Sequence, residues 1–237
     1  MKGTLYLIPC PISEETQPYE VMPEANRAII DSLDYFIVEN VRSARRFLSK
    51  AGISRRIDDL EFVELNEHST AGREVERMVG PLLDGRSAGV ISEAGVPAVA
   101  DPGQLVVELC HRRGIRIVPL VGPSSILMAV MASGLSGQSF AFNGYLPIKE
   151  PDRSKAIKRL ETRSKSEQQS QLFIEAPYRN TKLAEQLLRT CAPTTRLCIA
   201  CNITSSTEYI RTRTCAEWLK SGLPDIQKQP AIFILQG

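Results

Sequence analysis

A turn of small residues with one acidic side chain follows an apolar segment near the middle of the chain. Residues 88–91 read Ala-Gly-Val-Ile, and residues 92–97 read Ser-Glu-Ala-Gly-Val-Pro. The apolar run predicts a buried parallel strand, and ligands of open α/β sheets bind just beyond the carboxyl ends of such strands. Small residues let a ligand lie against the main chain, and the Glu93 carboxylate can accept hydrogen bonds from it. We therefore predict a small-molecule site here; the alternative is that Glu93 only caps the turn or the next helix.

Three further strand exits carry compact turns of similar character, at residues 9–12, 121–125 and 175–177. None has the Gly-x-Gly-x-x-Gly pattern of a dinucleotide fold, and the chain contains no Gly-x-x-x-x-Gly-Lys-Ser/Thr phosphate loop. It has only two histidines. These features argue against nicotinamide or flavin chemistry, against ATP hydrolysis and against a histidine-rich metal centre. We expect no metal site.

Strands and helices that alternate along the first half of the chain must position these turns. Apolar and β-branched runs predict strands at residues 4–8, 35–38, 62–65, 88–91 and 114–119. Helical patterns lie between them, at residues 24–32, 43–51, 72–83 and 103–112. The alternation predicts a mostly parallel sheet with helical crossovers.

The second half begins with Gly-Pro-Ser-Ser at residues 122–125, which can start a helix through residue 132. Later strands are predicted at residues 171–175, 196–201, 209–213 and 231–235, with the polar, lysine- and arginine-rich stretch 149–169 between them and the hinge. We predict an α/β protein of two domains, residues 1–120 with a mostly parallel sheet and residues 121–237 with a mixed sheet.

Composition restricts the environment and the partners. The chain has 29 basic and 27 acidic residues, so its formal charge of +2 creates no field that would attract a polyanion to the whole surface. Any RNA binding must be local. No apolar stretch approaches the roughly 20 residues that a membrane span requires, and no secretory leader is recognisable. We expect a cytoplasmic protein with reduced thiols, in which Cys198-x-x-Cys201 belongs to an apolar strand rather than to a zinc or redox site.

Four motifs occur in an order that resembles a known family. They are residues 92–97 continuing to Asp-Pro-Gly at 101–103, Pro-Leu-Val-Gly-Pro-Ser at 119–124, Gly-Tyr-Leu-Pro at 144–147 and Glu-Ala-Pro-Tyr-Arg at 175–179. In this order the chain resembles the tetrapyrrole methylase superfamily of S-adenosylmethionine-dependent methyltransferases. Within it, the chain is most similar to the small-subunit ribosomal RNA ribose 2'-O-methyltransferases. The resemblance extends over nearly the whole sequence.

The resemblance implies two α/β domains with the methyl donor, S-adenosylmethionine, in a cleft between them, and usually a homodimer. By position it assigns donor contacts to Pro9, Ser92, Glu93, Ala94, Gly95, Pro97, Ser124, Ser125, Glu175, Ala176, Asn202, Pro230 and Ala231. For Ser124 and Ser125 an ordinary helix N-cap is an equally natural role, and that role is compatible with ligand contact.

On the acceptor side, O-methylation needs a group that withdraws the proton from a hydroxyl. We predict Glu39 and His68 as catalytic residues, with Glu175 as a further candidate base. Arg42, Arg45, Arg46 and Arg179 are predicted to bind the phosphates of ribosomal RNA. The alternatives are a solvated helix face for the first three, an ion pair for Arg179 and a simple hydrogen-bonded loop for His68.

The acceptor-side motifs depart from the family pattern. The ribosomal enzymes commonly read Glu-Asp-Thr-Arg where residues 39–42 read Glu-Asn-Val-Arg, have His at the position of Tyr178, and carry Arg-Glu-Leu-Thr-Lys where residues 201–205 read Cys-Asn-Ile-Thr-Ser. The expected function is methylation of a ribose 2'-hydroxyl in RNA of the small ribosomal subunit. Because of these departures, two alternative functions are kept. One is methylation of a tetrapyrrole or another small molecule, and the other is a paralogue that binds the donor without catalysis.

Overall fold

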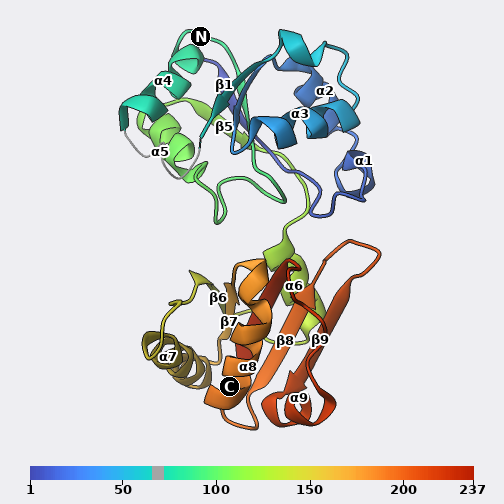
Figure 1. Ribbon diagram of the computed structural model, residues 1–237. Helices are drawn as coiled ribbons and strands as arrows, with labels where there is room; N and C mark the ends of the chain where they lie inside the picture. Colours follow the sequence, from blue (N-terminus) through green and yellow to red (C-terminus); the bar gives the residue numbers. More distant parts are fainter. Residues whose placement is uncertain (66–71) are drawn as a thin grey trace. The chain divides into compact units, whose positions relative to one another are not determined.

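The computed structural model describes residues 1–65 and 72–237, which divide into two compact units, Met1–Ser124 and Ser125–Gly237 (Figure 1). The boundary lies four residues beyond the one expected from the sequence, so Ser124 and Ser125 fall in different units. Each unit is built on its own five-stranded sheet. Within the described ranges, no helix is both long enough and apolar enough to cross a membrane.

Unit 1 contains the predicted parallel sheet. Its strands are β1 (Thr4–Ile8), β2 (Tyr35–Val38), β3 (Glu61–Glu64), β4 (Ala88–Ile91) and β5 (Arg116–Pro119). They lie in the order β3-β2-β4-β1-β5, and every pair is parallel. The central strands β2 and β4 are buried along their whole length, as the unbroken apolar runs predict for a sheet covered on both faces.

Helices cover both faces of this sheet (Figure 1). They are α1 (Pro18–Val21), α2 (Asn26–Ser32), α3 (Val41–Lys50), α4 (Gly72–Leu83) and α5 (Gln104–Arg112), with a 3-10 turn at Ile57–Asp59. Because side chains alternate along a strand, Tyr35 and Ile37 pack with α4 and α5, whereas Phe36 and Val38 pack with α2 and α3. The short helix α1 and the 3-10 turn are elements of this unit that the sequence pattern does not predict.

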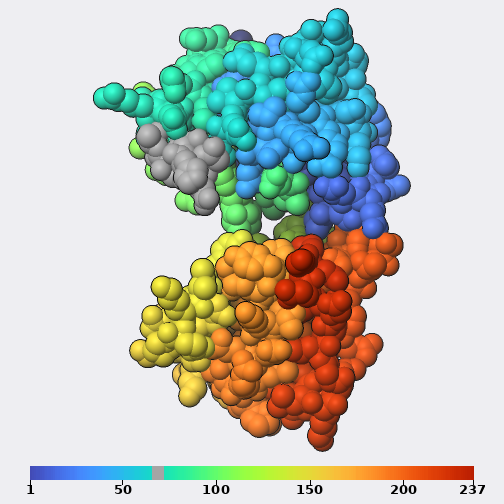
Figure 2. Space-filling model, viewed as in Figure 1, coloured from blue at the N-terminus to red at the C-terminus, as the bar shows by residue number. Residues whose placement is uncertain are grey.

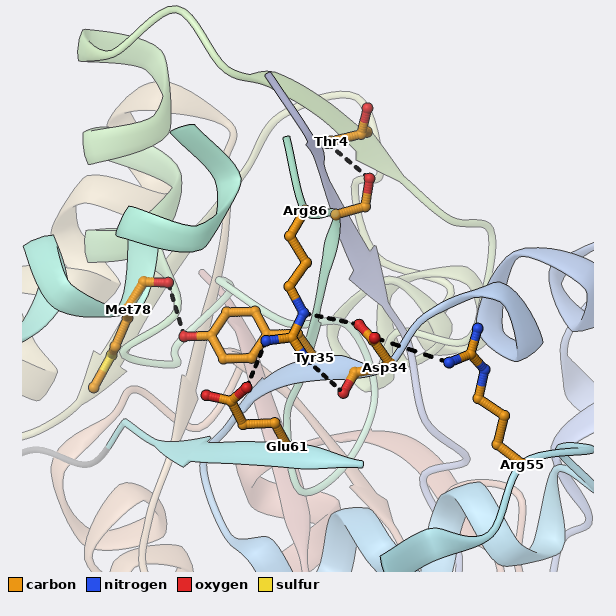
Figure 3. Close-up of polar contacts among 8 residues, drawn as sticks. Thr4, Asp34, Tyr35, Arg55, Glu61, Met78 and Arg86 are labelled. Atoms are coloured by element: carbon orange, nitrogen blue, oxygen red, sulfur yellow. Dashed lines mark hydrogen bonds and ion pairs between the residues drawn. The ribbon is translucent and has the colours of Figure 1, made fainter. Parts of the chain in front are cut away.

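A polar network closes the sheet at the amino ends of its strands (Figure 3). The Arg86 guanidinium donates to Asp34 Oδ1 at 2.9 Å and to Glu61 Oε2 at 2.5 Å, and it lies 4.9 Å from the centre of the Tyr35 ring. These residues precede or begin β2, β3 and β4. The network therefore fixes the amino ends of these strands. The predicted ligand-binding turns emerge at the opposite, carboxyl ends.

Unit 2 contains the predicted mixed sheet. Its strands are β6 (Phe140–Tyr145), β7 (Ser170–Ile174), β8 (Arg196–Cys201), β9 (Tyr209–Thr214) and β10 (Ala231–Gln236), in the order β6-β7-β10-β8-β9. Only the β6–β7 pair is parallel; the other three pairs are antiparallel. This arrangement confirms the predicted fold class for both halves of the chain.

Three helices pack on one side of this second sheet around a single core. They are α7 (Asp152–Glu167), which occupies most of the polar stretch, α8 (Asn180–Thr190) and α9 (Cys215–Ser221). Trp218 is buried in this core and its indole N–H donates to the Leu197 carbonyl at 2.9 Å. Helix α6 (Ser125–Ser133) packs outside this core against β8, β9 and β10, where Thr212 Oγ1 donates to the Ser133 carbonyl at 2.6 Å.

Candidate active site

The carboxyl ends of neighbouring strands bring the predicted turns of unit 1 to one edge of its sheet. In the parallel register, Ile91 at the end of β4 pairs with Ile8 of β1 on one side and with Val38 of β2 on the other. The sites that follow directly are the predicted donor and catalytic positions, namely Pro9, Glu39, Ser92 and Glu93. Residues separated by more than 80 positions in sequence thus share one row of the sheet.

Hydrogen bonds connect the turn after β4 to the exit of β2. The Glu39 N–H donates to the Ile91 carbonyl, and the Glu93 N–H donates to Glu39 Oε2, each at 3.2 Å. Ser43 Oγ donates to Glu93 Oε1, also at 3.2 Å. Glu93 is exposed and Glu39 is half-buried. One carboxylate therefore faces solvent at the turn, and the second is held directly behind it.

The surroundings of Glu39 suit a group that accepts a proton. Burial raises the pKa of Glu39; the hydrogen bond from the Glu93 amide opposes this shift, and the Asp101 and Glu93 carboxylates add to it. A carboxylate whose pKa lies closer to neutrality is a better general base at physiological pH than an ordinary glutamate. Both position and electrostatics are therefore consistent with the predicted role of Glu39.

The turns after β1, β4 and β5 are held together by main-chain contacts. Cys10 N–H donates to the Gly95 carbonyl at 2.8 Å, and Gly95 N–H donates to the Cys10 carbonyl at 3.1 Å. Gly95 has a φ of +71°, a left-handed conformation that favours glycine. The Pro9 ring packs against Gly122 so closely that a Cβ at position 122 would lie 2.2 Å from Pro9 Cγ. Three of the predicted turns therefore form one connected wall.

Asp101 lies close to this wall and was not among the predicted site residues. Its Oδ1 accepts a hydrogen bond of 2.6 Å from Gly103 N–H, whereas its buried Oδ2 has no hydrogen-bond partner among the described residues. Burial raises the pKa of Asp101, opposed by the hydrogen bonds from Gly103 and Ala98. Ala98 and Ala100 have φ values of +64° and +57°, which are uncommon for residues other than glycine and mark local strain in this loop.

Helix α3 begins directly after Glu39. Asn40 is its N-cap, and its side-chain oxygen accepts a hydrogen bond of 3.0 Å from the Ser43 N–H. Asparagine caps a helix as well as aspartate does, so this departure from the family pattern preserves the helix start. The three predicted RNA-binding arginines of α3 have different surroundings. Arg45 pairs with Asp58, Arg46 pairs with Glu14 at 3.2 Å, and Arg42 is exposed.

The donor positions predicted in unit 2 also lie together at one edge of a sheet. Ile174 at the end of β7 pairs with Ile232 of β10, and Ala231 at the start of β10 pairs with Cys201 at the end of β8. Asn202 N–H donates to the Pro230 carbonyl at 3.0 Å. The predicted residues at this edge are Glu175, Ala176, Asn202, Pro230 and Ala231. The topology thus brings the positions that the resemblance assigns to the donor in this unit to one edge of the sheet.

Glu175 itself is a buried anchor. Its side chain is only 1% exposed, and its two oxygens face Arg179 at 2.6 Å and Arg153 at 3.6 Å. Arg153 also donates to the carbonyls of Pro147 and Ile148 at 2.7 and 2.6 Å. The carboxylate therefore balances the charges of two arginines, of which Arg153 also holds the turn after β6, and we infer that any ligand contact at position 175 is made by the main chain. This arrangement makes Glu175 a poor candidate for the base.

The remaining predicted residues are placed as follows. Ser92 is buried, with its hydroxyl donating to the Ala94 carbonyl at 3.4 Å, and Pro97 is also buried. Ser124 ends unit 1 and Ser125 begins α6. Arg179 pairs with Glu175, and its guanidinium lies 4.8 Å from the centre of the Tyr178 ring. His68 lies outside the described residues.

The structure also bears on metal binding. Strand β8 places Cys201 in the core shared with α7, α8 and α9, and because side chains alternate, Cys198 three positions earlier points to the other face. These two cysteines cannot chelate one ion. Among residues 1–65 and 72–237, no group of three or more His, Cys, Asp or Glu side chains is arranged to hold a metal.

Comparisons with known proteins define the family. The model of the tetrapyrrole (corrin/porphyrin) methylases matches residues 20–218. The ribosomal RNA small subunit methyltransferase I of Escherichia coli O157:H7 is 26% identical over 239 residues, which cover 100% of this chain and 78% of that protein.

Solved structures of low identity share the fold. The methyltransferase CobJ superposes with a TM-score of 0.64 at 15% identity, covering 100% of this chain and 94% of that one. The uroporphyrin-III C-methyltransferase from Thermus thermophilus, complexed with S-adenosylhomocysteine, gives a TM-score of 0.58 at 16% identity, covering 99% and 97%. At these identities the likeness concerns architecture alone.

A parallel α/β unit whose turns gather at the carboxyl ends of its strands, followed by a mixed-sheet unit, is the two-domain architecture that the chain shares with these solved structures. The chain belongs to the tetrapyrrole methylase family. It is a methyltransferase that uses S-adenosylmethionine. The residues present fit this donor, because Gly95 supplies a left-handed turn and Glu93 offers an exposed acceptor for hydroxyl or amine groups. Gly122 lets the Pro9 ring pack against the turn after β5.

Proposed function

We propose that the acceptor is RNA of the small ribosomal subunit and that the methylated atom is a ribose 2'-hydroxyl oxygen. The observation that carries this proposal is the position of Glu39, a half-buried carboxylate one hydrogen bond behind the donor turn. The name of the Escherichia coli relative, which this chain matches over its whole length, supports RNA as the acceptor. The α3 arginines supply local positive charge for a phosphate backbone.

The residues divide into a donor side and an acceptor side. When bound, S-adenosylmethionine supplies a methyl group activated by its sulfonium. Glu93 and the main chain of residues 92–97 orient the donor. The contacts with Pro9 and Gly122 hold this turn in place. Glu39 accepts the proton of the attacking hydroxyl as the new oxygen–carbon bond forms and the carbon–sulfur bond breaks, with the electron pair of that bond remaining on sulfur. Positioning and one proton transfer suffice for this displacement.

The partners and location follow from this role. Arg42, Arg46 and Arg179 are proposed to contact the RNA, whereas Arg45 is held by Asp58 and is not part of the proposed RNA contact. His68 remains a proposed catalytic or substrate-contacting residue. We propose that the protein works in the cytoplasm, where ribosomal RNA is processed, and that it forms a homodimer. Light scattering of the purified chain gives its mass directly, and a value of one chain would contradict the dimer.

The activity assay separates the proposed function from its alternatives. The purified chain is incubated with methyl-tritiated S-adenosylmethionine and, separately, small ribosomal subunits, total RNA or a uroporphyrin-type tetrapyrrole. Label in RNA that appears in nucleotides resistant to alkaline cleavage is the expected result, because a 2'-O-methyl group prevents attack on the adjacent phosphate. Label in the tetrapyrrole would contradict the RNA assignment. Donor binding in calorimetry without transfer to any acceptor would indicate a noncatalytic paralogue.

A further inference from the structure

A small pocket opens on unit 1 beside the proposed site. It lies between α3 and the segment that follows β1, and its lining includes Ser13, Glu14, Ser43, Arg46 and Lys50. Figure 2 shows the surface of this early segment (dark blue) next to that of α3 (lighter blue). Its volume is about 90 Å³, well below the roughly 300–1,000 Å³ of pockets that enclose a whole ligand. A space of this size suits one small group.

The cations at this pocket come from one face of α3. Arg42, Arg46 and Lys50 are spaced four residues apart, so they form an exposed row with about 6 Å of rise between neighbours. Arg45 is excluded from the row, because it pairs with Asp58 and lies 6.0 Å from the centre of the Phe62 ring. The α3 arginines are therefore not equivalent.

An anionic side chain of the protein already occupies the mouth of the pocket. Glu14 Oε2 lies 3.2 Å from Arg46 Nη1, and the Glu14 carbonyl accepts a hydrogen bond of 2.8 Å from Lys50 Nζ. The Glu14 side chain is 80% exposed and that of Arg46 is 51% exposed. Exposed ion pairs of this kind contribute at most about 1 kcal/mol, so a polyanion can displace the carboxylate. Glu14 marks where an external anion would sit.

The pocket is also connected to the donor turn. Ser43 lines it and donates its hydroxyl proton to Glu93 Oε1 at 3.2 Å, and Glu93 itself forms part of the lining. An anion held by Arg46 and Lys50 is thus separated from the candidate donor turn by the Ser43 side chain. The group that fits this place is a phosphate of the same strand that presents its ribose to Glu39.

We propose that this pocket binds one backbone phosphodiester of a single-stranded RNA acceptor, with Arg46 and Lys50 as its ligands and Glu14 as the carboxylate it displaces. Arg42 extends the row toward the next phosphate. This inference rests on the proposed function, since it assigns a subsite to the RNA acceptor. It predicts that Glu14 opposes RNA binding although it lies in the binding pocket.

The test measures RNA affinity over a series of salt concentrations. The full chain, Arg46→Gln, Lys50→Gln, their double variant and the control Arg45→Gln are titrated into fluorescently labelled single-stranded RNA from the small subunit. Each phosphate contact on single-stranded nucleic acid contributes about 0.7 to the slope of log affinity against log salt. We expect the double variant Arg46→Gln/Lys50→Gln to reduce the magnitude of the slope by about this amount, each single variant to reduce it by a smaller amount, and Arg45→Gln to leave it unchanged. Glu14→Gln should raise the RNA affinity severalfold at low salt.

Three results would overturn the proposal. They are an equal loss of slope in Arg45→Gln, unchanged slopes in both pocket variants, or weaker RNA binding by Glu14→Gln. This test and the transfer assay can fail separately. If RNA is methylated but the pocket variants keep the salt dependence of the full chain, only the pocket assignment is refuted. If the variants show the expected slopes but no methyl group is transferred, only the proposed reaction is refuted.

Discussion

The main-chain N–H of Glu93 donates a hydrogen bond to the side chain of Glu39 across 3.2 Å. This contact joins the turn after β4 to the exit of β2, two places that are 54 residues apart in the chain. It gives the two carboxylates different tasks, because Glu93 projects to solvent at the turn while Glu39 is half-buried behind it. Substitutions at the two positions should therefore have different effects.

Replacing Glu39 by Gln should slow methyl transfer strongly without changing the affinity for the methyl donor. Glutamine keeps an oxygen for the Glu93 N–H but cannot accept a proton, so kcat should fall by about 10²- to 10⁴-fold. Calorimetry should give an unchanged affinity for S-adenosylmethionine. The comparison is Glu93→Ala, which should weaken donor binding more than Glu39→Ala does. Equal losses of donor affinity would contradict the separation into donor and acceptor sides.

The pH profile of methyl transfer should report the environment of Glu39. A base acts when deprotonated, so the rate should rise with pH through the pKa of Glu39, which burial places above the ordinary glutamate value of about 4.3. Asp101→Asn removes one carboxylate that raises this pKa. The acid limb of log kcat against pH should then move to lower pH. A limb that stays in place in this variant, or moves to higher pH, would argue against Glu39 as the base.

Glu175→Gln should destabilise unit 2. Removing one partner of a buried ion pair leaves uncompensated charge and typically costs about 3–5 kcal/mol, and here two arginines, Arg153 and Arg179, would be affected. Trp218 is the only tryptophan and lies buried in unit 2, so its fluorescence during urea unfolding reports on this unit.

The matched control for that measurement is Glu185→Gln. Glu185 pairs with Arg189 at 3.9 Å on the surface of α8, with both side chains at least half exposed, so its loss should change the unfolding free energy by less than about 0.5 kcal/mol. A similar, small change in both variants would mean that the buried pair contributes no more than a surface contact.

Gly122→Ala should weaken donor binding by disturbing the wall of turns. A methyl group there would lie 2.2 Å from Pro9 Cγ, so the turn after β1 or the turn after β5 must move. Gly80→Ala is the comparison, since nothing lies within 4 Å of its added Cβ in α4, where alanine is favoured by about 1 kcal/mol. Calorimetry with S-adenosylmethionine should show reduced affinity only for the first variant. Equal affinities would place the donor away from Pro9.

The strand exits were predictable because parallel topology alone determines where they meet. Apolar runs located β1, β2 and β4 to the residue, and once these strands are neighbours their following residues must share an edge. In unit 2 the pairs β7–β10 and β10–β8 are antiparallel, so Ala231 at the start of β10 meets Glu175 and Asn202, which follow β7 and β8. For Asp101 a signal existed in the Asp-Pro-Gly motif, but its burial and its effect on Glu39 depend on how the loop folds back.

Pairings between distant side chains were not predictable from the pattern. Arg153 is one of many basic residues in the stretch 149–169, and nothing local distinguishes it as the partner of Glu175, 22 positions later. On α3, likewise, helical spacing does not separate Arg45 from Arg42, because residues three apart lie on one face of a helix. The arginines are distinguished only by their partners in the fold, Asp58 for Arg45 and Glu14 for Arg46.

The pair of hydrogen bonds between Cys10 and Gly95 has a consequence for how the family diversifies. Both bonds are made by the main chain, so the contact between the two turns does not depend on the identity of the side chain at position 10, provided that it fits a buried space. Relatives that differ at position 10 can therefore keep the turn after β1 joined to the turn after β4.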